Sequence, residues 1–344
     1  MPIEFRKEVS QSRLLDPNKN YEETSLRFER RFDPLTQSSI GVFDSGLRSF
    51  KPAKPDLPGL VKRSLELGCP FCPDKIEKVT PKYPPDILPE GRLSRGEILA
   101  FPNALNFAPY SGVVVLTNRH FLDIGEFTEE IIAGGFEACQ TLLQNIAGRD
   151  PGVKYLTINW NYLPPSGGSV VHPHLQPAAD FYPCNHMKEM MEASKRYHEE
   201  NGSNFWPDLI ARERELGERY VGATGRVSWI TPFVPRGRFM DIMAILEGDN
   251  SILTVSAEQW QDFARGLKNV LNYIGDMGFY SYNLTMFSTV QREDHFWTHA
   301  RILPRVAFPP FEVSDCSYIE LLQGQISTAK PAEDTCGELK GYFV

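Results

Sequence analysis

The chain has 344 residues, of which 41% are hydrophobic and 23% are charged, and its formal net charge is −8. These proportions are typical of a folded globular protein and exclude a disordered or collagen-like chain. At about 150 residues per domain, the length predicts two domains or one duplicated unit. The acidic charge argues against a nucleic-acid-binding surface, while a local site for one phosphate group remains compatible with it.

The start of the sequence is charged and has no apolar stretch of the kind found in signal peptides. The longest apolar runs, such as Gly112 to Leu116, are far too short to span a bilayer. Six cysteines are too few for a disulfide scaffold, and two of them form the pattern Cys69-Pro-Phe-Cys72, which in a cytosolic chain favours metal or redox chemistry. We therefore expect a soluble, cytoplasmic protein with no membrane segment.

The first part of the chain predicts little regular structure. Residues 1 to about 60 are polar and contain several prolines, and only the turn at 31–36 leads into a short expected strand at 40–43. After Gly96, strands are expected at 97–101, 111–116 and 154–161. Between the last two, Thr128 is typical of a helix cap. The apolar residues that follow recur at helical spacing: Ile132, Phe136, Cys139, Leu143 and Ile146.

The second part of the chain repeats this order. Strands are expected at 226–230, 240–246, 280–287 and 299–303, and Ser256 begins a helix with apolar residues at Trp260, Phe263, Leu267, Val270 and Ile274. Thr128 and Ser256 lie 128 residues apart, and segment 171–177 aligns with segment 298–304. We predict an α+β fold with one unit used twice, over 1–185 and 186–344, each a mainly antiparallel sheet with a packed helix. The charged segment 187–219 predicts a solvated helical connector.

The clearest chemical signal is the segment Ser166 to Gln176, which reads SGGSVVHPHLQ. Alternate side chains of an extended strand share a face, so His172, His174 and Gln176 are expected on one side. Backbone amides of a glycine-rich turn can hold phosphate oxygens, and an imidazole can attack phosphorus. Ordinary strand histidines are the competing interpretation, which the adjacent Gly167, Gly168 and Gln176 make less favourable.

The cysteine pair predicts half of a metal site. Thiolates at the spacing of Cys69 and Cys72 bind tetrahedral zinc, which needs two further ligands. No second pair of this kind exists, and His120 and His172 are the candidate partners. A pair of buried or reactive thiols is the alternative interpretation.

These motifs resemble those of galactose-1-phosphate uridylyltransferases, which belong to the histidine-triad superfamily. The resemblance covers most of the chain. Its landmarks, in the family's order, are residues 33–36 (DPLT), Arg48, Lys51, residues 69–72 (CPFC), residues 101–103 (FPN), His120, Asn161 and residues 167–176.

The resemblance implies two fused histidine-triad-like units and a nucleotidyltransferase that works by double displacement. His174 matches the family's nucleophile, and Gln176 matches the amide that stabilises phosphoryl oxygens. Cys69, Cys72, His120 and His172 match the ligands of one structural zinc ion. The implied substrate contacts are Arg48, Lys51, Asn103, Asn161, Gly167, Gly168, Ser169, Tyr318 and Gln325, and a homodimer is implied.

Three positions depart from the family's pattern, two at the substrate and one at a second metal site. Ala104 stands where the family has an aspartate that binds ribose, and Ile319 replaces a glutamate that contacts the sugar. Loss of such a hydrogen-bonding group changes substrate preference strongly. His299 aligns with one ligand of a second, iron-type site seen in some relatives, but Arg301 occupies the place of another, so the resemblance gives only weak support for such a site.

The leading functional prediction is transfer of UMP between a UDP-sugar and a sugar 1-phosphate through a covalent nucleotidyl-histidine. The alternative is an adenylyl-transferring phosphorylase that acts on an ADP-sugar or a diadenosine polyphosphate. A nucleotide-binding protein without turnover is a third possibility, against which Gln176 and the complete HPHLQ sequence argue.

Overall fold

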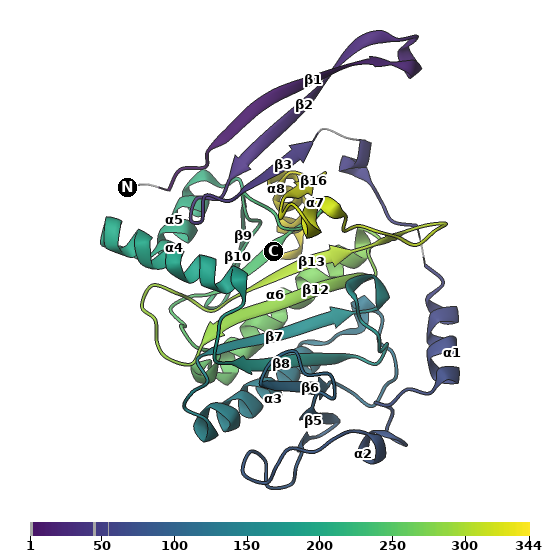
Figure 1. The fold of residues 1–344 in the computed structure, drawn as a ribbon, viewed down its shortest axis with the longest axis vertical. Helices are drawn as coiled ribbons and strands as arrows, with labels where there is room; N and C mark the ends of the chain where they lie inside the picture. Colours follow the sequence, from purple (N-terminus) through teal and green to yellow (C-terminus); the bar gives the residue numbers. More distant parts are fainter. Residues whose placement is uncertain (1–2, 44–45, 54) are drawn as a thin grey trace.

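The computed structural model describes residues 3–43, 46–53 and 55–344, and its main feature is a ten-stranded antiparallel sheet (Figure 1). The strands, in their order across the sheet, are β4 (Leu93–Arg95), β5 (Ile98–Pro102), β6 (Tyr110–Val115), β8 (His174–Asp180), β7 (Tyr155–Tyr162), β12 (Ser281–Thr289), β13 (His299–Arg305), β11 (Ile242–Leu246), β10 (Val227–Ile230) and β9 (Tyr220–Thr224).

The strand order shows the predicted duplication. The first half runs β4-β5-β6-β8-β7 and the second half runs β9-β10-β11-β13-β12, so the same order occurs twice. The two halves join where β7 pairs with β12, from Tyr155 opposite Thr289 to Tyr162 opposite Tyr282. The predicted α+β class with mainly antiparallel units is therefore confirmed. The division of the chain at residues 185 and 186 stays our proposal.

One long helix from each half lies behind the sheet, α3 (Glu129–Arg149) and α6 (Ala257–Asp276) (Figure 1). Their predicted caps are present, because the side chains of Thr128 and Ser256 accept hydrogen bonds from backbone amides in the first turn. All ten apolar positions predicted for these helices are buried. Phe136 of α3 packs against Trp260 and Phe263 of α6, so the two helices share one core with the sheet.

The structure corrects the prediction that segment 187–219 is a solvated connector. It forms α4 (Asn185–Asn201) and α5 (Phe205–Leu216), and the side chain of Trp206 is completely buried. Met243 and Ile245 of β11 pack in the same cluster as Trp206, whereas their neighbours Ala244 and Leu246 belong to the core that contains α6. Helices α4 and α5 therefore cover the second face of the sheet. Their outer surface is highly charged, and for this reason the sequence did not indicate that they pack on the sheet.

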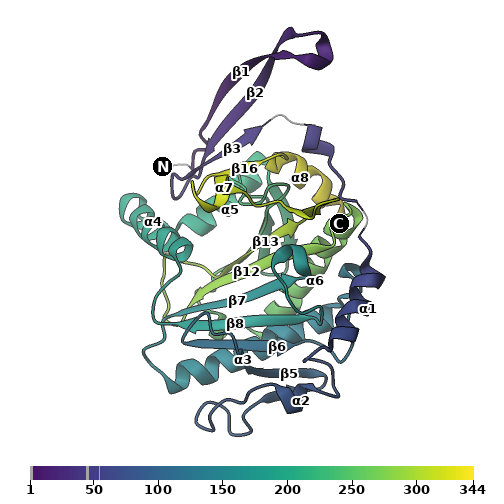
Figure 2. The same cartoon turned by 45° about the vertical axis from the view of Figure 1, so that its right-hand side comes forward.

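The prediction of an irregular amino-terminal segment is wrong. Strands β1 (Lys7–Asp16) and β2 (Glu22–Phe32) form a long antiparallel hairpin that extends away from the body (Figures 1 and 2). Nearly all side chains of β1 are exposed, so no alternation of polar and apolar residues marks it in the sequence. Strand β3 (Ser39–Phe43) continues this sheet and pairs in parallel with β16 (Ile326–Thr328), which brings the two ends of the chain together.

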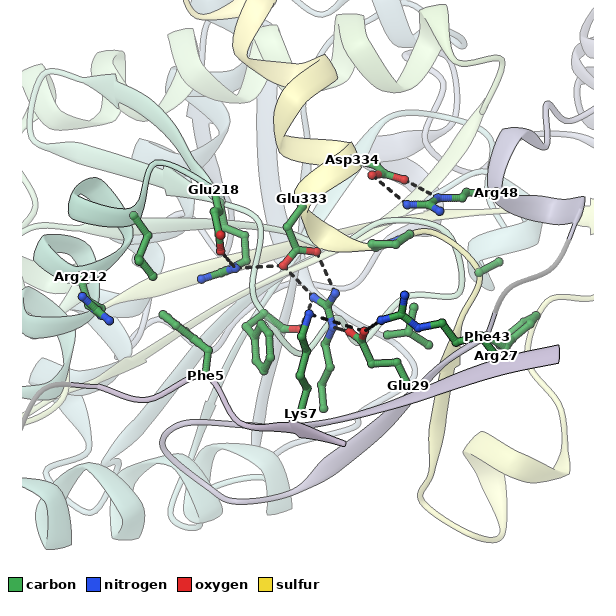
Figure 3. Close-up of a pocket in the computed structure, with 17 residues that line it drawn as sticks. Phe5, Lys7, Arg27, Glu29, Phe43, Arg48, Arg212, Glu218, Glu333 and Asp334 are labelled. Carbon is green, nitrogen blue, oxygen red and sulfur yellow. Dashed lines mark hydrogen bonds and ion pairs between the residues drawn. The ribbon is translucent and has the colours of Figure 1, made fainter. Parts of the chain in front are cut away.

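An ion-pair network holds the foot of the hairpin to the body, around a cavity of about 530 Å³ (Figure 3). The buried Arg31 donates to Glu29 on its own strand and to Glu333 of α8 (Ala332–Leu339). The buried Arg219 donates to Glu213, Glu218 and Glu333. Glu333 therefore bridges two arginines from distant parts of the chain.

The remaining elements are short. They are α1 (Leu57–Leu67), α2 (Ile76–Val79), α7 (Tyr318–Leu321), β14 (Ala307–Phe308) and β15 (Val313–Ser314), with 3₁₀ turns at η1 (Pro17–Lys19), η2 (Gly46–Ser49), η3 (Ile124–Glu126), η4 (Pro164–Ser166), η5 (Ile252–Thr254) and η6 (Lys340–Tyr342). In the described part of the chain, no helix is both long enough and apolar enough to cross a membrane.

Candidate active site and metal site

The four predicted metal ligands converge at one point. One ligand atom from each of Cys69, Cys72, His120 and His172 lies within 4.8 Å of the others. The cysteines follow α1, whose last turn ends at Gly68 in a left-handed conformation (φ +87°) that favours glycine. His120 follows β6 and His172 precedes β8, so three distant segments meet here.

The hydrogen bonds fix the ring nitrogens that face the thiols. Nε2 of His172 lies 2.7 Å from the carbonyl oxygen of Thr117, which can only accept, so Nε2 carries the proton. Nε2 of His120 lies 2.7 Å from the hydroxyl of Ser64, and that hydroxyl donates to the carbonyl of Val61. His120 must therefore also donate from Nε2. In both rings Nδ1 keeps its lone pair and faces a cysteine sulfur, at 3.4 Å for His120 and Cys72.

This donor set fits a bound metal ion. Burial, followed by the proximity of Cys69, raises the pKa of Cys72 to about 11, so the Cys72 thiol resists ionisation on its own. A nearby cation reverses this effect, because a metal stabilises thiolates. Burial lowers the pKa of His172 to about 4, which keeps the ring neutral and able to coordinate. The cluster can hold a metal ion, and among the described residues it is the one group of metal-binding side chains of this kind.

His174 lies in a different setting from His172, two residues away. Its Nδ1 lies 2.8 Å from the carbonyl oxygen of His172 and must donate to it, so the lone pair is on Nε2. The ring lines a cavity of about 300 Å³ and is 8% exposed. Burial lowers the pKa of His174, which favours the neutral ring. His174 therefore offers an uncharged nitrogen lone pair at a cavity wall.

The predicted shared face holds for part of the HPHLQ segment. Strand β8 begins at His174, and Gln176 lines the same cavity as His174. His172 lies before the strand and turns its ring toward the cysteines. Pro173 therefore separates the residue that faces the cysteines from the residues that line the cavity.

The glycine loop has the geometry of a backbone cradle. Gly167 has φ +84°, and a side chain at Gly168 would place its Cβ 2.9 Å from the carbonyl oxygen of Asn161. Asn283 of β12 donates to the side-chain oxygen of Asn161 and to the carbonyl of Ser166. The second half of the molecule thus braces the loop of the first half.

The structure separates the predicted substrate contacts into two groups. Asn103, Asn161, Gly167, Gly168 and Ser169 line the cavity with His174 and Gln176. The other four do not line it. Arg48 donates to Asp334, Lys51 is exposed, Tyr318 is 62% exposed, and Gln325 bonds to Arg30 and to the carbonyl of Ser39.

Several cavity residues were not anticipated as site residues. Phe71, Val79, Phe101, Leu105 and Phe107 give the cavity an apolar wall, and Phe107 is 80% exposed. Phe71 also meets the His174 ring edge-on, with 5.2 Å between the ring centres. The position of Phe71 between the two cysteines was the available sequence signal, whereas nothing in the pattern of Val79 or Phe107 marks them.

The second half has a closed counterpart of this site. Strand β13 begins at His299 as β8 begins at His174, and Nδ1 of His299 lies 2.9 Å from the carbonyl two residues earlier. By this geometry His299 is the counterpart of His174, whereas the sequence alignment had matched it with His172. Trp206 stacks on the His299 ring at 4.4 Å and covers it. Arg301 forms a buried ion pair with Asp241.

Comparisons with known proteins give a relative in sequence and several proteins of similar fold. No family model matches the chain. A protein of Archaeoglobus fulgidus, described as an uncharacterized protein, is 31% identical over 94% of both chains.

Among solved structures, a GalT-like protein from Arabidopsis thaliana is similar with a TM-score of 0.70 and 17% identity, and an ADP-glucose phosphorylase from the same plant with 0.69 and 16%. A uridylyltransferase is similar with a TM-score of 0.66 and 19% identity. Each of these matches covers 91% of this chain and 98% of the other.

The fold is thus that of the galactose-1-phosphate uridylyltransferase family, as the motifs predicted. The chain belongs to the same family as the Archaeoglobus protein.

Proposed function

We propose that the protein is a nucleotidyltransferase that acts through a covalent nucleotidyl-His174 intermediate. The observation that supports this best is the hydrogen bond from Nδ1 of His174 to the carbonyl of His172, which leaves the lone pair on Nε2 of a ring that lines the same cavity as the glycine loop and Gln176. The uridylyltransferase and the ADP-glucose phosphorylase with the same fold are named for this class of reaction.

In the first step, Nε2 of His174 attacks the α-phosphorus of a nucleoside diphosphate sugar. A phosphorus–nitrogen bond forms, and the bond from the α-phosphorus to the bridging oxygen breaks, so the sugar 1-phosphate leaves with the electron pair. The ring becomes positively charged, and its Nδ1 proton remains bonded to the carbonyl of His172, which stabilises that charge. In the second step a phosphate oxygen of the acceptor attacks phosphorus and the phosphorus–nitrogen bond breaks.

The side chains around His174 supply positioning and charge stabilisation. The amide of Gln176 lines the cavity on the same strand and can donate to an α-phosphate oxygen, where negative charge develops. Residues 167–169 line the same cavity, and the backbone amides of such a turn can hold phosphate oxygens. A neutral nucleophile suits this step because it does not repel the anionic phosphate.

The proposal also names the nucleotide base and the sugar of the substrate. We take UMP transfer between a UDP-sugar and a sugar 1-phosphate as the leading reaction. Adenylyl transfer to phosphate from an ADP-sugar is the alternative, which the likeness to an ADP-glucose phosphorylase favours. Ala104 in the cavity wall offers no carboxylate to the ribose, so galactose-type specificity has weaker support than the chemistry.

Intact-protein mass spectrometry tests the reaction and the base together. Incubation with a UDP-sugar or an ADP-sugar is expected to add one uridylyl or one adenylyl group, and His174→Ala is expected to add none. His299→Ala is the matched control and should still form the adduct, since that ring is covered by Trp206. No adduct with any nucleoside diphosphate sugar, from a folded protein, would refute the proposal.

We further propose that the metal is zinc and that it has a structural role. Two thiolates and two imidazoles are the ligand set of closed zinc sites, which stabilise a fold without binding substrate. Such an ion would hold His172, and with it the start of β8, in place. Cys69→Ser is expected to lose metal and stability together, measured by elemental analysis and thermal unfolding. Full metal content in that variant would contradict the ligand assignment.

A homodimer is also part of the proposal. Tyr318 and Gln325 do not line the His174 cavity of their own chain, so a role toward substrate requires a second copy to supply them. Analytical ultracentrifugation tests the assembly. A mixture of inactive His174→Ala and Tyr318→Ala chains that regains activity would support a shared site.

A further inference from the structure

A row of polar side chains crosses the junction between the two halves of the sheet. Asn161 of β7, Asn283 of β12 and Arg305 of β13 lie on adjacent strands, and Asn283 is directly opposite Asn161. The neighbouring Trp160 and Tyr282 belong to the core that contains α3 and α6. Because successive side chains of a strand point to opposite faces, the polar row lies on the face away from these helices.

The row begins at a buried ion pair. The side chain of Asp315 is 5% exposed, and it accepts hydrogen bonds from Nε and Nη2 of Arg305, at 3.0 and 2.6 Å. Nη1 of Arg305 donates to Oδ1 of Asn283, 2.7 Å away. A guanidinium group can only donate, so the atom of Asn283 that faces it must be the oxygen. The ion pair therefore fixes the direction in which the amide of Asn283 points.

The orientation of Asn283 in turn fixes that of Asn161. Nδ2 of Asn283 donates to the carbonyl of Ser166 at 2.9 Å and to Oδ1 of Asn161 at 2.6 Å. The carbonyl can only accept, so it requires the same orientation of Asn283 as the arginine does. Asn161 lines the cavity of His174, and among the described residues its Nδ2 group has no hydrogen-bond partner. This group is therefore available to a ligand in the cavity.

The direction of the Asn161 amide decides which ligand it favours. The two ends of an amide are nearly equal in size, but Nδ2 donates hydrogen bonds and Oδ1 only accepts them. Hydrogen bonds from a donor to a charged phosphate oxygen are stronger than those between neutral groups, whereas two acceptor oxygens repel each other. An anion in the cavity therefore requires the orientation that Asn283 imposes.

We propose that Asn283 and Arg305 are positioning residues, which hold Asn161 with its N–H group toward a phosphate group in the His174 cavity. The inference rests on the proposed function for the identity of that anion as the phosphate of a nucleotide. It assigns the second half of the molecule a role in the site of the first half, beyond support of the glycine loop.

Asn283→Asp tests the orientation with a side chain of the same shape. A carboxylate still accepts from Arg305 but cannot donate, so Asn161 must turn over, donate to the carboxylate and present its oxygen to the cavity. Isothermal titration of the full chain with UMP and with AMP measures the effect. For the nucleotide that the unmodified chain prefers, we expect binding to weaken at least about tenfold, as for a lost hydrogen bond to a charged group.

The same substitution in an Asn161→Ala background separates positioning from a structural role. Without the amide there is no group to orient, so Asn283→Asp should change the affinity by less than about twofold there. Arg305→Lys keeps a charge beside Asp315 and serves as the second variant if Asn283→Asp does not fold. A single ammonium lacks the fork of the guanidinium, so we expect about threefold weaker binding, again only where Asn161 is present.

Tyr273→Phe is the matched control, since it removes a hydrogen bond to Glu338 from helix α6, on the other side of the sheet. It should bind both nucleotides as the unmodified chain does. Equal weakening by Asn283→Asp in both backgrounds would show a merely structural role and overturn the inference. Unchanged nucleotide affinity in Asn283→Asp, or no binding of UMP or AMP to the unmodified chain, would also overturn it.

Nucleotide binding does not require nucleotidyl transfer, so the inference and the proposed function can fail separately. Absence of the His174 adduct, together with the expected dependence on Asn161, would refute the proposed function and support the positioning role. Normal adduct formation, together with equal effects in both backgrounds, would refute the positioning role alone.

Discussion

The hydrogen bond between Ser64 and His120 gives a direct test of the metal site. The Ser64 hydroxyl accepts from Nε2 of His120 at 2.7 Å while it donates to Val61, so it fixes the tautomer that leaves Nδ1 free for the metal. Ser64→Ala removes this acceptor and leaves a half-buried N–H without a partner in the protein. The hydrogen bond therefore acts on metal affinity and not on substrate directly.

The expected loss of metal affinity follows from typical hydrogen-bond energies. One net hydrogen bond is worth about 1 kcal/mol, somewhat more when a group is left unsatisfied, and about 1.4 kcal/mol corresponds to a tenfold change in affinity. Partners of metal-bound histidines typically contribute about 10- to 100-fold in metal affinity. We expect Ser64→Ala to weaken zinc binding about tenfold.

Competition with a chromophoric zinc chelator measures this affinity without any enzyme assay. Ser64→Thr retains a hydroxyl and should stay close to the unmodified protein, whereas Cys69→Ser should lose far more affinity than Ser64→Ala. Equal affinity of Ser64→Ala and the unmodified chain would show that the tautomer is not set by Ser64.

Three further predictions concern the covered histidine, the glycine loop and the hairpin network. Trp206→Ala should lower the free energy of unfolding by about 3–5 kcal/mol, because a fully buried ring is lost; urea unfolding measures this, and Tyr182→Ala, at a site 78% exposed, should change it by less than about 0.5 kcal/mol. Gly167→Ala places a side chain at φ +84° and should lower the free energy of unfolding by about 1–2 kcal/mol and slow adduct formation on His174. Gly96→Ala, at φ +60° in another turn, should lower the free energy of unfolding by a similar amount and leave the adduct rate unchanged. For Glu333, burial opposes ionisation, but the ion pairs with Arg31 and Arg219 outweigh it and lower its pKa. Its stabilisation is therefore present above the unfolded-state pKa of about 4.3 and is lost as pH falls through the lower folded-state value, so the stability difference between the unmodified chain and Glu333→Gln should shrink in acid. A difference that grows in acid would contradict the assignment.

Much of the fold was accessible from local patterns. The helices α3 and α6 were predicted from their caps and their apolar spacing, because one face of each packs on the sheet and leaves a clear period. Most strands of the ten-stranded sheet were also predicted, from β-rich runs between turn residues, whereas the short strands β4 and β9 were not. The hairpin β1–β2 was missed because it packs on almost nothing, and α5 was misjudged because four charged residues in its last turns mask a buried Trp206.

The candidate site divides in the same way. The sequence alone predicted which residues carry the chemistry, because CxxC and HPHLQ are short motifs that are recognisable without the fold, while His120 lies far from both in the chain. Tertiary structure decided the roles of neighbouring histidines: Thr117 and Ser64 orient the metal-facing rings, and the carbonyl of His172 orients His174. It also decided that Arg48 and Gln325 lie outside the cavity and that Trp206 covers His299. The physical reason is that a ring's tautomer, an arginine's counter-charge and the access to a lone pair depend on groups that are distant in sequence, and only the packed chain brings those groups within bonding distance.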